Sequence, residues 1–350
     1  MSPLLTPVRI GDLDLPNRVV MAPLTRTRSD AARLPNALMA EYYRQRASAG
    51  LIISEATVVS ERGAGYANTP GIWSSAQTEA WKPITAAVHA AGGRIFLQLW
   101  HVGRISHSSL NGGSQPLAPS AVAPAGRVAL VRPETDYEVP EAASAEQIQQ
   151  VIEQFRSGAS NAQAAGFDGV ELHGANGYLL DQFLHDHSNR RDDDYGGSIA
   201  NRARLLLQCT DAAISVWGAD RVGVHLSPRC DVHDVGDSTR EQTFLHVATE
   251  LGRRRIAFVC AREHAGEGRI GPQLKAAFGG RYIANEGFDQ ASGEAALAAG
   301  EADAVAYGRM FIANPDLPQR FATGAALNAP NPATFYGAGG SGYTDYPALT

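Results

Sequence analysis

Three polar side chains follow one apolar stretch and could together bind and protonate a substrate. The run Gly169-Val-Glu-Leu predicts a short strand, and His173, Asn176 and Tyr178 come directly after it. A spacing of three would place His173 and Asn176 on one face of a helical turn. Neutral histidine and asparagine can both donate hydrogen bonds to an oxygen. Tyrosine, with an unperturbed pKa of about 10, stays protonated at neutral pH. These residues therefore predict a polar substrate site.

Eight short apolar runs indicate the fold that must position this site. They lie near residues 19–22, 51–55, 94–99, 169–172, 221–226, 256–260, 281–284 and 304–307. Continuous apolar runs of this length are typical of parallel strands that are buried on both faces. We therefore predict an α/β protein with one domain over residues 1–350, a single (β/α)8 TIM barrel. A β-hairpin at 3–15 would precede it, and a long loop at 101–143 would be inserted after the third strand.

Helical spacing fills most of the intervals between these strands. Helices are predicted at residues 37–49, 77–91, 198–217 and 290–299. Two capping-box patterns, Ser144 to Gln147 and Ser238 to Glu241, predict the starts of two more.

Composition excludes several classes of partner. Hydrophobic residues make up 44% of the chain and charged residues 19%, and the net charge of −6 includes no basic block. These values argue against disorder and against nucleic acid as the main partner. The N-terminus lacks a signal pattern, and no apolar run approaches the ~20 residues that span a bilayer. Because Cys209, Cys230 and Cys260 are scattered, we expect a soluble, cytoplasmic protein with reduced cysteines.

In a TIM barrel, the residues just past each strand gather at one end of the molecule. Besides the first motif, these would be residues 23–25, 55–56, 98–101, His225, Cys260, 285–287 and 308–309. Gly287, followed by a helix, and Gly308 with Arg309 offer free amides and a guanidinium, which favour phosphate. The alternative at these positions is ordinary turn chemistry.

Two other motifs carry weaker signals. Gly266 to Gly271 matches G-x-G-x-x-G, but it does not leave its strand directly, so a mobile loop is expected. His185 and His187 resemble a metal pair, but no third ligand stands at a recognisable spacing. A solvated, partly helical loop is predicted there, and no metal site.

Longer motifs cover essentially the whole chain in order. They are Pro23-Leu-Thr25-Arg, residues 41–57, Gln98-Leu-Trp100-His-Val-Gly-Arg, His173-Gly-Ala-Asn176-Gly-Tyr178-Leu-Leu, residues 188–198, Gly308-Arg309 with residues 313–316, and residues 335–347. In these motifs the sequence resembles the Old Yellow Enzyme family. Within the family it looks most like the bacterial branch of N-ethylmaleimide reductase, pentaerythritol tetranitrate reductase and xenobiotic reductase.

The resemblance implies a barrel that holds FMN noncovalently at the C-terminal ends of its strands. It implies a ping-pong ene-reductase, in which NADPH or NADH is the reductant and electron-poor alkenes are the substrates. These would be α,β-unsaturated carbonyls, maleimides and nitroalkenes, with nitrate esters and nitroaromatics as further candidates. A monomer or homodimer that acts on small molecules is expected.

The same resemblance assigns roles residue by residue. Ala22, Pro23, Leu24, Thr25, Ala56 and Gln98 would contact the flavin, and Gly287, Gly308 and Arg309 would bind its phosphate. His173 and Asn176 would hold the substrate oxygen, and Tyr178 would protonate carbon. Thr25, Tyr66, Trp100 and Tyr343 would shape the substrate pocket.

The chain departs from the family pattern at two positions. Many relatives carry histidine where this chain has Asn176, although asparagine also occurs. His225 stands where the family commonly places an arginine beside flavin N1 and C2=O. Either His225 takes this site, giving a weaker and pH-dependent field, or Arg229 reaches in.

Two other functions remain compatible with a phosphate-binding barrel. A lyase or isomerase could use the sites at 287 and 308 for a sugar phosphate, although no lysine stands at a strand end to form a Schiff base. A flavin-binding protein without catalytic activity is the other alternative.

Overall fold

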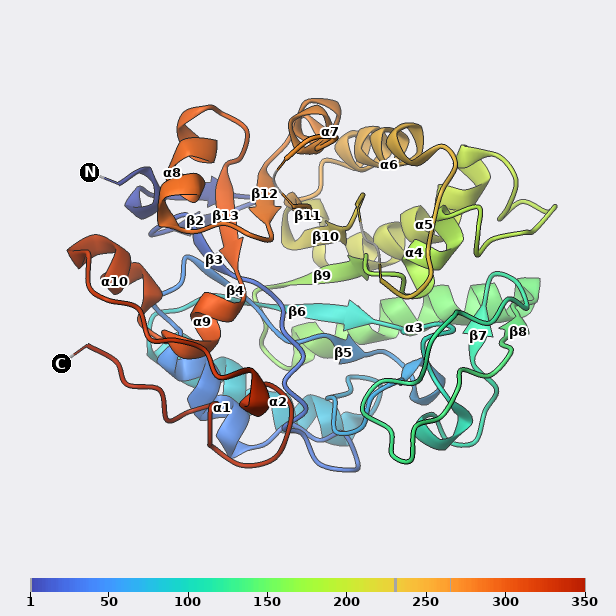
Figure 1. The fold of residues 1–350 in the computed structure, drawn as a ribbon, viewed down its shortest axis with the longest axis horizontal. Coiled ribbons are helices and arrows are strands. Elements are labelled where there is room, and N and C mark those ends of the chain that lie inside the picture. Colours follow the sequence, from blue (N-terminus) through green and yellow to red (C-terminus); the bar gives the residue numbers. More distant parts are fainter. Residues whose placement is uncertain (1, 230–231, 265, 350) are drawn as a thin grey trace.

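The parallel strands close into a barrel. The computed structural model describes residues 2–229, 232–264 and 266–349, so Cys230 lies outside the described residues. Within these ranges the barrel strands are β3 (Val19–Met21), β4 (Leu51–Ile53), β6 (Ile95–Trp100), β9 (Gly169–Gly174), β10 (Val222–Leu226), β11 (Phe258–Arg262), β12 (Tyr282–Asn285) and β13 (Ala304–Tyr307). Each pairs in parallel with its neighbours, and the pairing of β4 with β6 closes the ring (Figure 1). The predicted TIM barrel is confirmed.

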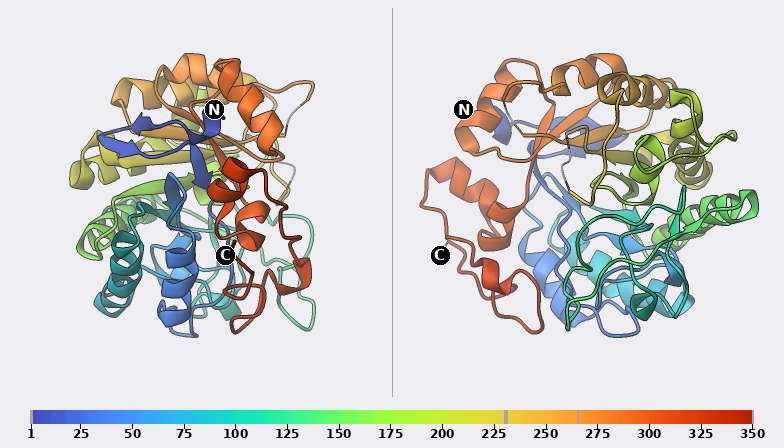
Figure 2. Two further views of the ribbon diagram at one scale, coloured as in Figure 1. Left: turned by 90° about the vertical axis from the view of Figure 1, so that its left-hand side faces the viewer. Right: turned by 45° about the vertical axis from the view of Figure 1, so that its right-hand side comes forward.

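Helices pack around the outside of this barrel (Figure 1; Figure 2). The longer ones are α1 (Ala37–Gln45), α2 (Ser75–Ala90), α3 (Ala145–Ala164), α5 (Ile199–Trp217), α6 (Arg240–Arg254), α7 (Gly271–Phe278) and α8 (Gln290–Ala298). Shorter ones are α4 (Leu179–Leu184), α9 (Arg309–Ala313) and α10 (Leu317–Thr323), with 3₁₀ turns at Pro3–Leu5, Glu61–Gly63, Ser108–Leu110, Ala219–Arg221 and Pro332–Thr334. In the described part of the chain, none of the helices combines the length and apolarity needed to cross a membrane.

The two predicted capping boxes have different outcomes. At the start of α3, the Ser144 hydroxyl accepts from the Gln147 amide at 3.2 Å, and the Gln147 side chain accepts from the Ser144 amide at 2.8 Å. The second box is wrong. The Ser238 hydroxyl bonds to Asp186 instead, and α6 begins at Arg240 without a side-chain cap. A nearby carboxylate competes for the serine that would otherwise cap the helix.

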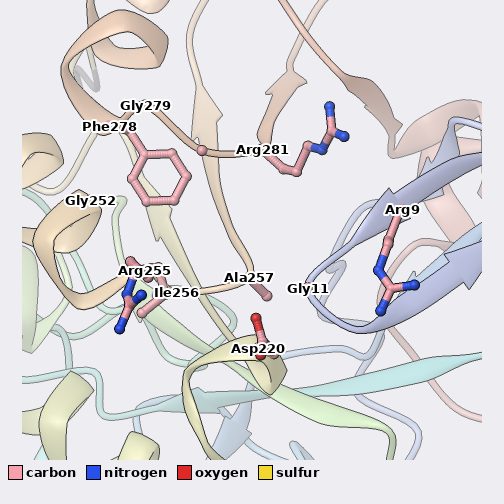
Figure 3. A pocket seen from close by; sticks show the side chains of 11 residues that line it. Arg9, Gly11, Asp220, Gly252, Arg255, Ile256, Ala257, Phe278, Gly279 and Arg281 are labelled. Carbon is pink, nitrogen blue, oxygen red and sulfur yellow. The ribbon is translucent and has the colours of Figure 1, made fainter.

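The N-terminal hairpin closes one end of the barrel. Strands β1 (Val8–Ile10) and β2 (Leu13–Leu15) pair antiparallel around Gly11, whose φ is +58°. A Cβ at Gly11 would lie 1.9 Å from the backbone oxygen of Asp220, so only glycine fits this close approach. A cavity of about 320 Å³ lies here, between the hairpin and the residues that precede β10, β11 and β12 (Figure 3). The hairpin therefore covers the N-terminal ends of the barrel strands and does not cover their C-terminal ends.

The predicted insertion after the third barrel strand is long and largely irregular. Its regular pieces are β7 (Leu117–Ala118) and β8 (Glu141–Ala142), which pair in parallel, together with one 3₁₀ turn. The guanidinium of Arg104 is buried and donates to the carbonyls of Val122 at 3.0 Å and Asp234 at 2.6 Å. These bonds fix the insertion to the loop after β10. Short strand β5 (Thr57–Val58) extends the sheet beside β6.

Candidate active site

A cavity of about 810 Å³ lies over the C-terminal ends of the barrel strands. This volume falls within the range of ~300–1,000 Å³ that is typical of ligand and cofactor pockets. The predicted residues that line it are Ala22, Pro23, Leu24, Thr25, Ala56, Tyr66, Gln98, Trp100, His173, Asn176, Tyr178, His225, Gly287, Gly308 and Arg309. They come from segments far apart in the sequence, and the barrel brings them together because its parallel strands end on one face.

The segment after β9 does not form the helical turn that the spacing suggested. His173 still belongs to β9, Asn176 adopts a left-handed φ of +58°, and α4 begins only at Leu179. The Asn176 amide donates to the Ser227 hydroxyl at 2.6 Å, and the Gly177 amide donates to the Asp181 carboxylate at 2.8 Å. This turn is tight, yet it still directs His173, Asn176 and Tyr178 into the cavity.

Burial keeps the histidine and the phenol of this segment uncharged. Desolvation lowers the pKa of His173 well below its usual range, and the nearby His225, His233 and Arg262 lower it further. Desolvation also raises the pKa of Tyr178 well above its usual range, with a further contribution from Tyr66. The two phenolic oxygens of Tyr66 and Tyr178 lie 3.0 Å apart. At physiological pH the cavity therefore holds a neutral imidazole, an amide and a protonated phenol.

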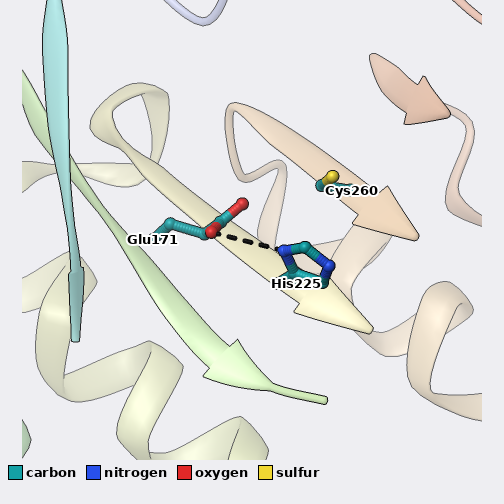
Figure 4. Close-up of side chains that lie close together, drawn as sticks. All are labelled: Glu171, His225 and Cys260. Carbon is teal, nitrogen blue, oxygen red and sulfur yellow. Dashed lines mark ion pairs between the residues drawn. The ribbon is translucent and has the colours of Figure 1, made fainter. Parts of the chain in front are cut away.

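His225 lies on the floor of the cavity, beside Glu171 and Cys260 (Figure 4). The Nδ1 atom of His225 is 3.5 Å from Oε2 of Glu171, which also accepts from Gln98 Nε2 at 2.7 Å. Both ring nitrogens of His225 are buried, and neither has a hydrogen-bond partner among the residues that the structure describes. Of the two predicted candidates for this position, His225 lines the cavity, whereas Arg229 donates to the backbone oxygen of His264.

Glu171, His225 and Cys260 bring three potential metal-ligand atoms within 4.8 Å of one another. They stand on three adjacent strands, and His225 pairs directly with Cys260 across the ladder. Sequence spacing could not reveal this cluster, because its members are far apart in the chain.

The sequence also gave no signal for Arg262, which lines the same cavity. Strand β11 was expected to end at Cys260, but it continues to Arg262. The guanidinium donates to Oδ1 of Asn176 at 2.9 Å and to the carboxylate of Glu286 at 2.8 Å. An unrecognised extension of the strand therefore places a cation against one of the predicted substrate-binding residues.

The loops after β12 and β13 form the predicted anion-binding end of the cavity. Gly287 has a φ of +79°, and among the described residues a Cβ there would meet a single atom within 4 Å, at 3.9 Å. Gly308 precedes α9, whose first residue is Arg309, and both line the cavity. The open backbone at Gly287, together with the Arg309 guanidinium, suits a phosphate.

Tyr343 does not shape the cavity, contrary to the prediction. It is fully buried and stacks on Tyr42 with ring centroids 4.0 Å apart, while the guanidinium of Arg28 lies 4.8 Å from its ring. Packing against this aromatic and cationic cluster directs the phenol into the protein. Phe335 and Tyr336 are the C-terminal residues that reach the cavity instead.

The contacts of the two weaker motifs, Gly266 to Gly271 and the pair His185 and His187, differ from those of the sites that their patterns resemble. The Glu263 carboxylate accepts from the amides of Ile270 and Gly271, both at 2.8 Å, so a carboxylate occupies the start of α7. His185 is buried rather than solvated, and its ring lies 3.1 Å from the buried carboxylate of Asp181. Although burial opposes it, Asp181 raises the pKa of His185. The prediction of a solvated loop at His185 is wrong, because this ion pair draws the ring inward.

Comparisons with known proteins decide the family. Residues 3–328 match the NADH:flavin oxidoreductase / NADH oxidase family. The chain belongs to this family. The Old Yellow Enzyme homologue of Zymomonas mobilis is 44% identical, with a TM-score of 0.97 over 99% of both chains. Morphinone reductase in complex with tetrahydroNAD is 47% identical, with a TM-score of 0.95 over 99% of this chain and 98% of that one.

Plant members of the NADH:flavin oxidoreductase family are similarly related. The 12-oxophytodienoate reductase 2 of Arabidopsis thaliana is 43% identical over 99% of this chain and 96% of its own length. These similarities confirm the resemblance to the Old Yellow Enzymes. The protein is therefore a flavin-dependent NAD(P)H oxidoreductase.

Proposed function

We propose that this protein is an FMN-dependent ene-reductase that uses NADPH or NADH to reduce electron-poor alkenes. The observation that carries this proposal is the convergence of His173, Asn176 and Tyr178 on one cavity. Two of these residues can donate to the oxygen that activates an alkene, and the third can protonate carbon. On its motifs, we place the chain with the bacterial reductases of N-ethylmaleimide and pentaerythritol tetranitrate.

The cavity residues fit FMN held noncovalently. The ring nitrogens of His225, which have no hydrogen-bond partner among the described residues, can pair with the polar edge of a flavin, and Gln98 and Thr25 line the same cavity. Ala22, Pro23, Leu24 and Ala56 offer small or apolar surface to the ring, and Gly287, Gly308 and Arg309 would hold the phosphate. The bound flavin supplies the hydride-transfer chemistry.

The protein's own residues orient the substrate and manage charge and protons. His173 and Asn176 bind the carbonyl or nitro oxygen and stabilise negative charge as it develops there, and the loss of one such donor costs ~10²–10³ in rate. Tyr178 then donates its phenolic proton to the α carbon. The Tyr66 hydroxyl, 3.0 Å from the Tyr178 oxygen, can donate to the phenolate that remains. Tyr66 and Trp100, stacked with centroids 5.5 Å apart, form the wall beside the reacting atoms.

The test begins with the colour and reducibility of the purified protein. We expect it to bind FMN, to turn yellow and to be bleached by NADPH or NADH without oxygen. It should then turn over cyclohexenone, N-ethylmaleimide, a nitroalkene and a nitrate ester. A protein that takes up no flavin, or whose flavin neither nucleotide reduces, would overturn the proposal.

Tyr178→Phe separates the proton-dependent activities. Removing the phenolic proton should slow alkene reduction ~10²–10⁴-fold, whereas reduction of nitro compounds should survive. Tyr195→Phe is the matched control, because the Tyr195 hydroxyl bonds only to Gln149 and Gln208 among the described residues. Equal losses in the two variants would show that Tyr178 is not the acid.

A further inference from the structure

Asn176 has two side-chain atoms that could face a substrate, and only one of them helps catalysis. Its Nδ2 group donates hydrogen bonds, whereas its Oδ1 atom only accepts them. Rotating the amide by half a turn exchanges these atoms at little torsional cost, because this terminal torsion is broad and roughly two-fold. An amide that presented Oδ1 would repel the negative charge that develops on a substrate oxygen. A further interaction is therefore needed to hold the Asn176 side-chain amide in one orientation.

A hydrogen bond from Arg262 provides this interaction. Its Nη1 group donates to Oδ1 of Asn176 at 2.9 Å. A guanidinium has donors and no acceptor, so the amide atom that faces it must be the oxygen. Because the donor is charged, this bond is stronger than one between neutral groups. Within the described residues no acceptor is bonded to Nδ2 of Asn176, which leaves this donor for a ligand in the cavity.

The Arg262 guanidinium is itself held in place. Its Nη2 group donates to Glu286 at 2.8 Å, and the side chains of this ion pair are 29% and 22% exposed. Glu286 lies next to Gly287, in the loop after β12. The carboxylate therefore orients the guanidinium and offsets its charge, which reduces its direct attraction for the substrate oxygen.

The backbone of Asn176 is fixed as well. Its backbone N–H donates to the Ser227 hydroxyl at 2.6 Å, and its backbone carbonyl lies 2.6 Å from Nδ1 of His233. With the main chain fixed, the Asn176 side chain can still rotate. The hydrogen bond from Arg262 restricts this rotation.

We propose that Arg262 is a positioning residue that holds the Asn176 amide with its Nδ2 donor directed at the substrate oxygen. This inference rests on the proposed function, because it assigns the orientation of one of the two oxygen-binding donors. It also separates this chain from a relative with histidine at position 176, whose imidazole has no amide to orient.

A double-mutant cycle on the FMN-loaded protein tests the proposal. The proteins are the native chain, Arg262→Met, Asn176→Ala and the double variant, with Arg9→Met as a control for lost charge on the distant hairpin. One measurement is the rate of alkene reduction by the prereduced protein. The other is the affinity of the oxidised protein for a para-substituted phenol, whose phenolate imitates the developing enolate and perturbs the flavin spectrum.

Arg262→Met should slow alkene reduction and weaken phenol binding about tenfold or more. The double variant should be no worse than Asn176→Ala, because a residue that acts through Asn176 has no effect once the amide is gone. Arg9→Met should match the native chain. An equal loss from Arg262→Met in both backgrounds would show that Arg262 contacts the ligand directly and would overturn the proposal, as would no loss in either.

Two further variants guard against misfolding. Arg262→Gln keeps a neutral donor and should recover part of the activity. Asn176→His in the Arg262→Met background should recover more, because a neutral imidazole can place its proton on the nitrogen that faces the substrate without rotating. Failure of both variants to recover, with normal flavin content and melting temperature, would count against the proposal. If the native protein binds phenol and accepts electrons from NADPH but reduces no alkene, the proposed function fails, while the phenol series still tests Arg262.

Discussion

At the scale of single residues, the unusual feature of the site is the histidine on its floor. His225 occupies the cavity end of β10, with Nδ1 3.5 Å from the Glu171 carboxylate. An arginine would carry a fixed positive charge here, whereas a histidine carries one only when both of its ring nitrogens hold a proton. A positive charge beside a flavin favours its anionic reduced form, so the charge on His225 should influence the reduction potential.

His225→Arg should raise the flavin's midpoint potential, because it puts a fixed positive charge on the cavity floor beside the Glu171 carboxylate. This charge stabilises the anionic reduced flavin relative to the oxidised flavin. Redox titration of the FMN-loaded native protein and of the variant would measure the difference. An unchanged potential in the variant would contradict the placement of His225 beside the flavin.

At the scale of elements, the position of each functional side chain depends on where the strand before it ends. The barrel strands and long helices could be predicted because apolar runs and helical spacing record burial directly. Helix α4 was missed because all six of its residues are buried, so it shows no polar face and no amphipathic spacing. Arg262 was missed for a related reason, since β11 runs beyond its apolar run. The positions of Glu171, His225 and Cys260 follow from strand pairing, which spacing along the chain does not record.

The end of β6 offers a prediction about acid stability. His101 follows this strand, is 2% exposed, and accepts from the Gly103 amide through Nδ1 at 3.1 Å. Desolvation, helped by Arg62, lowers the pKa of His101 from 6.5 to about 3. Between these two pH values, His101 binds a proton in the unfolded chain but not in the folded chain. The folded state therefore loses stability as pH falls through this window, by up to about 1.4 kcal/mol per pH unit from this group.

His101→Asn should flatten this dependence, because asparagine can keep an acceptor near the Nδ1 position without titrating. Melting temperatures between about pH 6.5 and pH 3 would measure the slope. His187→Asn is the control, since the side chain of His187 is 69% exposed, and it should follow the native slope. Identical slopes for all three proteins would show that His101 is not the acid-sensitive group.

At the scale of the whole molecule, the C-terminal segment packs beside α1 and the segment that follows β3 (Figure 1). The Arg26 guanidinium donates to the carbonyls of Phe335 at 3.0 Å and Gly342 at 2.8 Å. Since Phe335 and Tyr336 line the cavity, these bonds hold one wall of the site against the segment after β3. The sequence motif that contains Tyr343 was informative about the family but not about this contact. A buried anchor and a pocket wall leave the same aromatic signal in a sequence.

Two substitutions at Tyr343 distinguish an anchor from a polar functional group. Its ring is buried against Tyr42, Arg26 and Arg28, but its hydroxyl has no hydrogen-bond partner among the described residues. Tyr343→Ala should cost about 3–5 kcal/mol of unfolding free energy, because it removes a large buried ring. Tyr343→Phe should stay within about 1 kcal/mol of the native protein or exceed it, since it removes an unsatisfied buried hydroxyl. Urea unfolding would measure both, and a large loss in Tyr343→Phe would show that the hydroxyl, rather than the ring, anchors the C-terminal segment.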